Sequence, residues 1–306
     1  MPHSATTSLP TFSKFSNKTS NPLNNKSIAA VAHGKTVPIG VFDSGYGGLT
    51  ILNAIRQQMP QYDYIYLGDN ARAPYGPLSF DVVYEFTLQA VKKLFALGCP
   101  LVILACNTAS AKALRTIQQG YIANEMPDHR VLGIIRPTAE IVGQLSQTKH
   151  IGVMATEGTI KSESYTLEIH NQTPRAHVTG LACPMWVPLV ENAEYDKPGA
   201  DYFVRERLEL LMDLDPLIDT IILGCTHYPF LLPKIRTYTP EHVTLVPQGK
   251  YIAASLEDYL GRHADMRKRL TEGGTCTYYT TENAEKFSEH ATLFFNKHID
   301  VQRITL

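Results

Sequence analysis

The sequence has 306 residues, of which 44% are hydrophobic and 19% are charged, and its formal net charge at pH 7 is −1. This length allows two globular domains, and the near-zero charge gives no electrostatic reason to expect nucleic acid as a partner. No stretch approaches the roughly 18 consecutive apolar residues of a membrane helix, so no membrane association is expected either.

The first 36 residues differ in composition from the rest of the chain. They are rich in Ser, Thr, Asn and Lys, contain no Asp or Glu, and lack the continuous apolar core of a secretory signal. An acid-poor, Ser-rich leader is also typical of organelle transit peptides, but those are rich in Arg, which is absent here. We therefore expect residues 1–36 to form a disordered leader.

From Val37 onward, short apolar runs alternate with amphipathic stretches such as Phe80–Ala96. Consecutive Ile, Val and Leu residues indicate strands buried on both faces, as in parallel sheets. The alternation predicts an α/β fold of mostly parallel sheets flanked by helices. The runs are Pro38–Phe42, Tyr64–Leu67, Leu101–Ala105, Val131–Ile135, Ile151–Met154, Val178–Leu181, Thr220–Leu223 and Val243–Val246.

Two domains are expected, because Pro137 interrupts the chain just after the fourth run. The first domain is predicted to comprise residues 37–133 together with residues 245–306. The second domain is predicted to span residues 134–244. The returning segment is expected to contribute a strand, a helix and a last strand, at Cys276–Thr280, Ala284–Asn296 and Val301–Leu306.

Polar side chains follow several of these runs, where ligands bind in open α/β sheets. Asp43 and Ser44 follow the first run, within the segment Phe42–Thr50, which contains three glycines. It matches neither the dinucleotide pattern G-x-G-x-x-G nor the P-loop, which ends in G-K-[ST]. It is either a plain tight turn or a loop whose amides and Asp-Ser pair hold an ammonium and a carboxylate.

One short sequence motif occurs twice, as Ile103–Thr108 and Ile222–His227, and each copy places a cysteine after an apolar run. A single buried cysteine is usually a small core residue. Two matched cysteines, Cys106 and Cys225, can instead face one substrate from opposite sides, removing a proton from one face and returning it on the other. Nearby amide donors and a helix N-terminus are expected to lower the thiol pKa from about 8.5 towards neutrality.

The five cysteines are odd in number and include no C-x-x-C pair, which argues against a disulfide framework or a zinc site and favours a reducing compartment. We therefore expect a cytoplasmic protein. No group of residues has metal-ligand spacing and H-E-x-x-H is absent, so no metal is expected.

Three further side chains are candidate functional residues, and each also has an ordinary structural explanation. His227 can exchange a proton with Cys225 or bond a carboxylate, or it can simply cap a helix. Glu191 follows an apolar run and is otherwise an ordinary solvated carboxylate. Asp69 follows the second run and is otherwise a turn cap.

Six motifs, in this order, resemble the cofactor-independent aspartate/glutamate racemase superfamily, and within it the glutamate racemases. The resemblance covers about Val37 to Leu306. The motifs are Phe42-Asp43-Ser44-Gly45-x-Gly47-Gly48, Gly68-Asp69-x-Ala71-Arg72-x-Pro74-Tyr75-Gly76, Ala105-Cys106-Asn107-Thr108-Ala109-Ser110, Thr156-x-Gly158-Thr159, Cys183-Pro184-x-x-Val187-Pro188-Leu189-Val190-Glu191 and Leu223-Gly224-Cys225-Thr226-His227-Tyr228-Pro229.

This resemblance implies two pseudo-symmetric α/β domains with the active site in the cleft between them, and interconversion of L- and D-glutamate for peptidoglycan synthesis without a cofactor. It implies that Cys106 and Cys225 are the two bases, that Asp43 supports Cys106, and that His227 and Glu191 support Cys225. The positions that match substrate-binding residues are Asp43, Ser44, Tyr75, Gly76, Asn107, Thr108, Thr159, Thr226 and His227. Asp69 matches a position that affects activity.

Some positions depart from the commonest pattern of the superfamily, but none of them removes a proposed catalytic group. They are Arg136–Thr138, Trp186 and Pro247–Lys250. An aspartate racemase, a single-cysteine decarboxylase or isomerase, and a two-lobed amino-acid-binding protein are the competing functions. A homodimer is the default expectation for the assembly.

Overall fold

The computed structural model describes residues 36–295 and 298–306, and Thr36–Leu306 forms one compact unit. The expected leader lies outside the described residues, apart from its last residue, Thr36. Within the described part of the chain, no helix has the length and apolar character needed to cross a bilayer.

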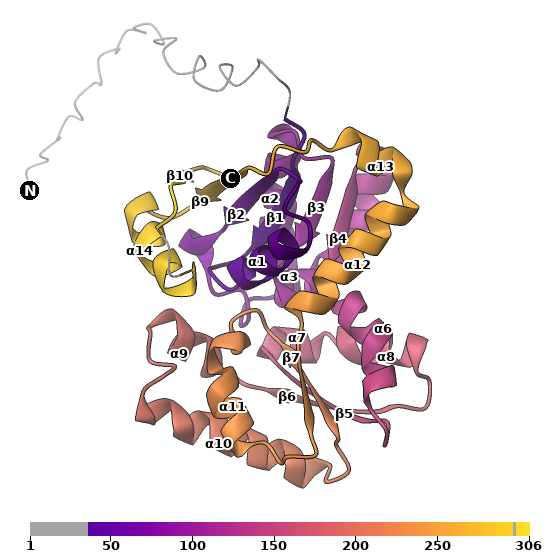
Figure 1. Cartoon of the computed structure of the whole chain (residues 1–306), viewed down its shortest axis with the longest axis vertical. Helices are drawn as coiled ribbons and strands as arrows, with labels where there is room; N and C mark the ends of the chain where they lie inside the picture. Colours follow the sequence, from indigo (N-terminus) through magenta and orange to yellow (C-terminus); the bar gives the residue numbers. More distant parts are fainter. Residues whose placement is uncertain (1–35, 296–297) are drawn as a thin grey trace, which may run out of the picture. The chain divides into compact units, whose positions relative to one another are not determined.

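Two sheets organise this unit (Figure 1), and every strand pair in them is parallel. The six-stranded sheet has the order β10-β9-β2-β1-β3-β4 and the four-stranded sheet the order β6-β5-β7-β8. The strands are β1 Ile39–Asp43, β2 Tyr64–Gly68, β3 Leu101–Leu104, β4 Arg130–Gly133, β5 His150–Ala155, β6 His177–Ala182, β7 Thr220–Gly224, β8 Thr244–Pro247, β9 Cys276–Thr280 and β10 Val301–Arg303.

Helices connect the strands and lie against both faces of each sheet. Those that flank the first sheet are α1 Gly48–Gln58, α2 Phe80–Ala96, α3 Asn107–Lys112, α4 Leu114–Ile117, α5 Ala123–Glu125, α12 Gly249–Arg262, α13 Ala264–Arg269 and α14 Ala284–Phe295, with the 3-10 turn η1 Asn70–Arg72 and the π-helical turn η2 Gln118–Ile122. Those of the second half are α6 Ile135–Leu145, α7 Glu157–Lys161, α8 Ser164–Gln172, α9 Trp186–Glu191, α10 Pro198–Leu214 and α11 Leu232–Tyr238, with the 3-10 turn η3 Tyr228–Leu231.

The apolar faces of these helices build four core clusters, one on each face of each sheet. In the first sheet, α1, α12, α13 and α14 cover one face, and α2, α3 and α4 cover the other. In the second sheet, α9, α10, η3 and α11 cover one face, and α6 and α8 cover the other. Helix α2 has the predicted bounds: it buries Val83, Ala90, Val91 and Leu94 at helical spacing, and the Ser79 side chain caps it by accepting from the Val82 amide (3.4 Å).

The predicted α/β class is confirmed, and each predicted apolar run is a strand within one or two residues of its expected bounds. The chain changes sheets after β4, where Ile134 packs in the core of the first sheet and Ile135 in that of the second. It changes back after β8. The expected boundary at residue 245 therefore cuts through a strand, because all of β8 pairs with β7 in the second sheet. The division into two domains stays a prediction.

Candidate active site

Cys106 lies directly after β3 and caps the N-terminus of α3. Its Sγ accepts a hydrogen bond from the Ala109 amide (3.4 Å) and shares another with Ser44 Oγ (3.3 Å), which follows the neighbouring strand β1. Parallel pairing of β1 with β3 brings these two strand ends together. Cys106 and Ser44 are both buried, at 6% and 8% exposure.

The expected lowering of the Cys106 pKa is wrong. Burial, and then the charge of Asp43, raise the pKa of Cys106 to about 12. The hydrogen bonds from Ser44 and the Ala109 amide act in the predicted direction, but they are outweighed. Cys106 is therefore a thiol, and so a proton donor, at neutral pH.

Asp43, the last residue of β1, is 1% exposed. Its Oδ2 accepts from the Gly45 amide (2.9 Å), whereas its buried Oδ1 has no hydrogen-bond partner among the described residues. Burial raises the pKa of Asp43, against the opposing charge of His227. A buried carboxylate with an open oxygen and a raised pKa is suited to accepting a proton or to binding an ammonium group.

Cys225 lies directly after β7, in a different electrostatic setting. Its Sγ is 3.7 Å from His227 Nδ1, and His227 Nε2 is 3.2 Å from Glu191 Oε1 at the end of α9. Burial alone would lower the pKa of His227, but its hydrogen bonds to Cys225 and Glu191 raise that pKa well above its ordinary value. Cys225 Sγ therefore lies beside the ring of His227, whose pKa is raised.

Glycines let the Asp43–Gly48 loop approach the residues around Cys225. A Cβ atom on Gly47 would lie 2.3 Å from Thr226 Oγ1 and 2.5 Å from His227 Nδ1. A Cβ atom on Gly45 would lie 3.1 Å from Glu191 Oε1. The Thr50 hydroxyl, in α1, also donates to the Thr226 carbonyl (3.1 Å). These contacts join the carboxyl ends of the two sheets and bring the two cysteines close enough for the charge of Cys225 to affect the pKa of Cys106.

Three threonines form a second connection between the sheets. Thr108 Oγ1 lies 2.9 Å from Thr156 Oγ1 and 3.4 Å from Thr159 Oγ1, and Thr156 Oγ1 lies 3.0 Å from Thr159 Oγ1. The carbonyl of Gly76 accepts from the Gly158 amide (3.1 Å) beside them. The predicted binding residues Gly76, Thr108 and Thr159 therefore lie together, with hydroxyl groups that can exchange their mutual bonds for a bound carboxylate.

Asn107 belongs to a buried network that joins the sheets. Its Nδ2 donates to Gln248 Oε1 (2.8 Å), and its Oδ1 accepts from Tyr165 Oη (2.7 Å). Gln248 Nε2 in turn donates to Tyr165 Oη (2.6 Å) and to Thr138 Oγ1 (3.1 Å). Asn107 therefore has one remaining Nδ2 hydrogen for a ligand, and its main contacts are with the protein.

Asp69 holds the loop that carries Tyr75 in place. Arg72 Nε and Thr281 Oγ1 donate to its carboxylate (2.7 Å and 2.8 Å), and the Tyr75 hydroxyl donates to Asp69 Oδ2. Burial and the Asp69 carboxylate raise the pKa of Tyr75, which keeps its hydroxyl protonated. The Tyr75 side chain is thus occupied by Asp69, and the loop offers its main chain to a ligand.

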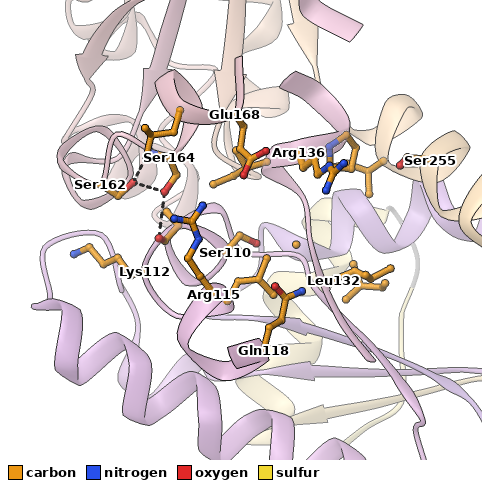
Figure 2. A pocket seen from close by; sticks show the side chains of 18 of the residues that line it. Ser110, Lys112, Arg115, Gln118, Leu132, Arg136, Ser162, Ser164, Glu168 and Ser255 are labelled. Atoms are coloured by element: carbon orange, nitrogen blue, oxygen red, sulfur yellow. Dashed lines mark hydrogen bonds between the residues drawn. The ribbon is translucent and has the colours of Figure 1, made fainter. Parts of the chain in front are cut away.

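Figure 2 shows a cavity of about 740 Å³. Its walls come from α3, α4, α6, α8 and α12, and none of the described residues that line it is a cysteine. Figure 2 shows Arg115, Arg136 and Glu168 around it, with a hydrogen bond between the hydroxyls of Ser162 and Ser164 (3.0 Å). Ser110 and Lys112 of α3 line the cavity, whereas Cys106 caps the start of the same helix.

Comparison with known proteins identifies the family. Residues 49–254 match the model of the Asp/Glu/Hydantoin racemase family. This chain belongs to that family. Glutamate racemases from Shouchella clausii (strain KSM-K16) and Roseobacter denitrificans (strain ATCC 33942 / OCh 114) are 39% and 37% identical to it, each over 86% of the chain and over 92% and 98% of their own lengths.

Solved structures of glutamate racemases are similar over most of the chain. A glutamate racemase isoform from Bacillus anthracis gives a TM-score of 0.80 at 33% identity and covers 90% of this chain and 99% of its own. The glutamate racemase from Francisella tularensis subsp. tularensis SCHU S4, in complex with D-glutamate, gives 0.77 at 31% identity and covers 88% and 97%.

Two residues bonded to the candidate site, Gln248 and Tyr165, were not predicted from the sequence. Gln248 appeared there only as part of a departure from the common pattern, and Tyr165 lies in α8, away from every motif. Both are buried polar side chains whose importance is visible only through their hydrogen bonds to Asn107. Thr156 was noted within a motif, but its contact with Thr108 was not predicted.

Replacing Gly47 by Ala is expected to reduce kcat by about a hundredfold, because the new Cβ atom displaces Thr226 and His227, and a shift of about 1 Å near the chemistry has that order of effect. Gly199→Ala in α10 is the matched control, since no described atom lies within 4 Å of its added Cβ. Steady-state racemisation measures both variants. Wild-type turnover in Gly47→Ala would contradict the proposed close approach.

Glu191→Gln is expected to lower the pKa of His227, because glutamine keeps an oxygen for Nε2 but removes the negative charge. A raised folded-state pKa stabilises the fold fully below the unfolded value of about 6.5, and this stabilisation is lost as pH rises through the folded-state value. The variant should therefore be less stable by about 1 kcal/mol in mildly acidic solution and approach the wild type in alkaline solution.

Urea unfolding across this pH range and NMR titration of the His227 ring measure the two effects. Glu194→Gln is the control, because Glu194 forms an exposed ion pair with Lys197 that contributes little. A His227 ring that titrates alike in Glu191→Gln and the wild type would refute the coupling.

Proposed function

We propose that this chain is a glutamate racemase that interconverts L- and D-glutamate by a two-base mechanism without a cofactor and supplies D-glutamate for peptidoglycan synthesis. The observation that carries the proposal is the pair of buried thiols, Cys106 and Cys225, at the carboxyl ends of two connected parallel sheets. The family match and the glutamate racemases among its relatives support the reaction and the substrate.

In one direction, the Cys225 thiolate removes the α-proton, which leaves the Cα–H electron pair on carbon. The Cys106 thiol then delivers its proton to the opposite face of that carbon. The surroundings of the two cysteines favour this direction, because Cys225 Sγ lies beside the ring of His227, whose pKa is raised, and the raised pKa of Cys106 keeps that thiol protonated.

The reverse direction needs the opposite protonation states. We assign Asp43 as the group that accepts the Cys106 proton, since its open Oδ1 and its raised pKa make it a stronger base than an ordinary carboxylate. His227, with Glu191 behind it, accepts or returns the proton of Cys225. Each cysteine thus has a chemically different proton acceptor: Asp43 for Cys106, and His227 with Glu191 for Cys225.

The carbanionic transition state lies beside a carboxylate and needs stabilisation by fixed dipoles. We assign this role to the predicted binding residues, which supply hydroxyls, an amide and main-chain groups around the site. The Tyr75–Gly76 loop contributes through its main chain, since Asp69 binds the Tyr75 hydroxyl. The polar side chains assigned to substrate are Asp43, Ser44, Asn107, Thr108, Thr159, Thr226 and His227.

Proton NMR of the enzyme with each glutamate enantiomer in D2O, together with a chiral assay, tests the reaction. Cys106→Ser and Cys225→Ser should each reduce racemisation by about 10²–10⁴-fold, the usual contribution of a positioned acid or base. Each variant should retain α-hydrogen exchange of at most one enantiomer, a different one for each cysteine. Cys276→Ser, outside the site, is the control.

Near-normal racemisation in either active-site variant would refute the two-base mechanism. Exchange with aspartate but not with glutamate would keep the family and overturn the substrate. Binding of glutamate without exchange of either enantiomer, under reducing conditions, would favour an amino-acid-binding protein.

We further propose a cytoplasmic homodimer. All five cysteines are free, which suits a reducing compartment. The exposed side chains of Leu210, Leu214 and Leu217, at the end of α10 and just beyond it, are the kind of apolar surface that a partner covers. Sedimentation velocity should detect a dimer that Leu214→Lys weakens, and a monomer at all micromolar concentrations would contradict the assembly.

A further inference from the structure

Three potential metal ligands meet at the amino edge of the second sheet, away from the site described above. His150 begins β5, His177 begins β6, and Asp215 follows the last residue of α10. His150 Nδ1 lies 2.8 Å from Asp215 Oδ2, and His177 Nε2 lies 3.8 Å from the same oxygen. One ligand atom from each residue can be chosen so that all three lie within 4.8 Å of one another.

The fold itself produces this arrangement. His150 and His177 are direct partners in the register of β5 and β6, so their rings project from the same face of the sheet, with centroids 5.1 Å apart. The Leu217 amide donates to Asp215 Oδ1 (3.1 Å), and Thr179 Oγ1 donates to Oδ2 (3.3 Å). These bonds orient a buried carboxylate towards the two imidazoles, as secondary hydrogen bonds do around metal ligands.

We propose that His150, His177 and Asp215 bind a divalent transition-metal ion of the zinc class, with water completing the coordination. Imidazole and carboxylate are the donors that such ions accept. Two ligands of a tetrahedral ion, each about 2.0–2.1 Å from it, are about 3.4 Å apart. The two His–Asp separations of 2.8 Å and 3.8 Å lie on either side of this value, and the His–His pair lies within 4.8 Å.

Binding requires little rearrangement. His150 Nδ1 exchanges its contact with Asp215 for the ion, and its proton moves to Nε2 or to solvent. The Asp215 carboxylate supplies one negative charge, which neutralises one of the two positive charges of the cation. The His177 side chain is 64% exposed, so it can rotate towards the ion without disturbing the core.

The proposed ion is structural and has no part in racemisation. The ligands lie at the starts of β5 and β6 and before β7, whereas Cys225 follows the other end of β7. An ion there would join the amino ends of two strands to the C-terminus of α10. It would therefore stabilise the second sheet without changing the chemistry of the thiols.

Co²⁺ titration of the untagged, chelator-treated full chain, followed by absorption spectroscopy, tests the site. The wild type should bind an equivalent of Co²⁺ with the weak visible bands of nitrogen and oxygen ligands, and Zn²⁺ should displace it. His177→Ala should bind at least about tenfold more weakly. His242→Ala is the matched control, because His242 is an exposed histidine just before β8 of the same sheet.

Zn²⁺ should also raise the thermal unfolding midpoint of the wild type and of His242→Ala, and raise it less in His177→Ala. Asp215→Asn, which keeps the side-chain shape but removes its charge, is a second test if His177→Ala folds poorly. Equal Co²⁺ affinity in the wild type and the variants overturns the proposal. So does a spectrum containing only intense thiolate-to-cobalt bands, which would place the ion at cysteines, or stabilisation by acidification with none by metal.

Discussion

The contact between the Asp43–Gly48 loop and the residues that follow β7 is the constraint on which the active site depends. Two separate parallel sheets each end in a cysteine, and a two-sided reaction needs these ends to face a single small substrate. Side chains at Gly45 and Gly47 would occupy the space that Glu191, Thr226 and His227 now fill. The glycines therefore act by leaving room for the opposite sheet, and the anion-binding loop suggested by sequence is also the contact surface between the sheets.

The two cysteines have the same position at a strand end, yet their surroundings differ in charge. Cys106 lies beside a buried carboxylate, Asp43, and Cys225 lies beside the imidazole of His227. In the proposed two-base mechanism one cysteine is a thiol while the other is a thiolate, and identical surroundings would favour neither arrangement. The neighbouring charges instead differ, with a carboxylate that raises the pKa of Cys106 and an imidazole next to Cys225.

The strands and the candidate site motifs are recognisable in the sequence, because each is a contiguous stretch of residues. Buried parallel strands require unbroken apolar runs, and the residues that follow them are the ones that bind ligands, so β1, β3 and β7 led directly to Asp43, Cys106 and Cys225. The pKa of Cys106 could not be predicted in this way. A helix N-terminus is visible in a sequence, whereas the extent of burial and the proximity of Asp43 depend on the packing of distant segments.

Gln248 and Tyr165 were missed for the same reason, because their role depends on how distant segments pack together. Neither belongs to a motif, and their role comes from buried hydrogen bonds that join residues far apart in the chain, with Asn107 at the centre. Buried polar groups left without partners are costly, so this network requires the two sheets to meet in one arrangement. Apolar packing alone would permit small displacements of one sheet against the other. The hydrogen-bonded amides and hydroxyls restrict that freedom, and with it the separation of the two thiols on which the proposed two-sided proton transfer depends.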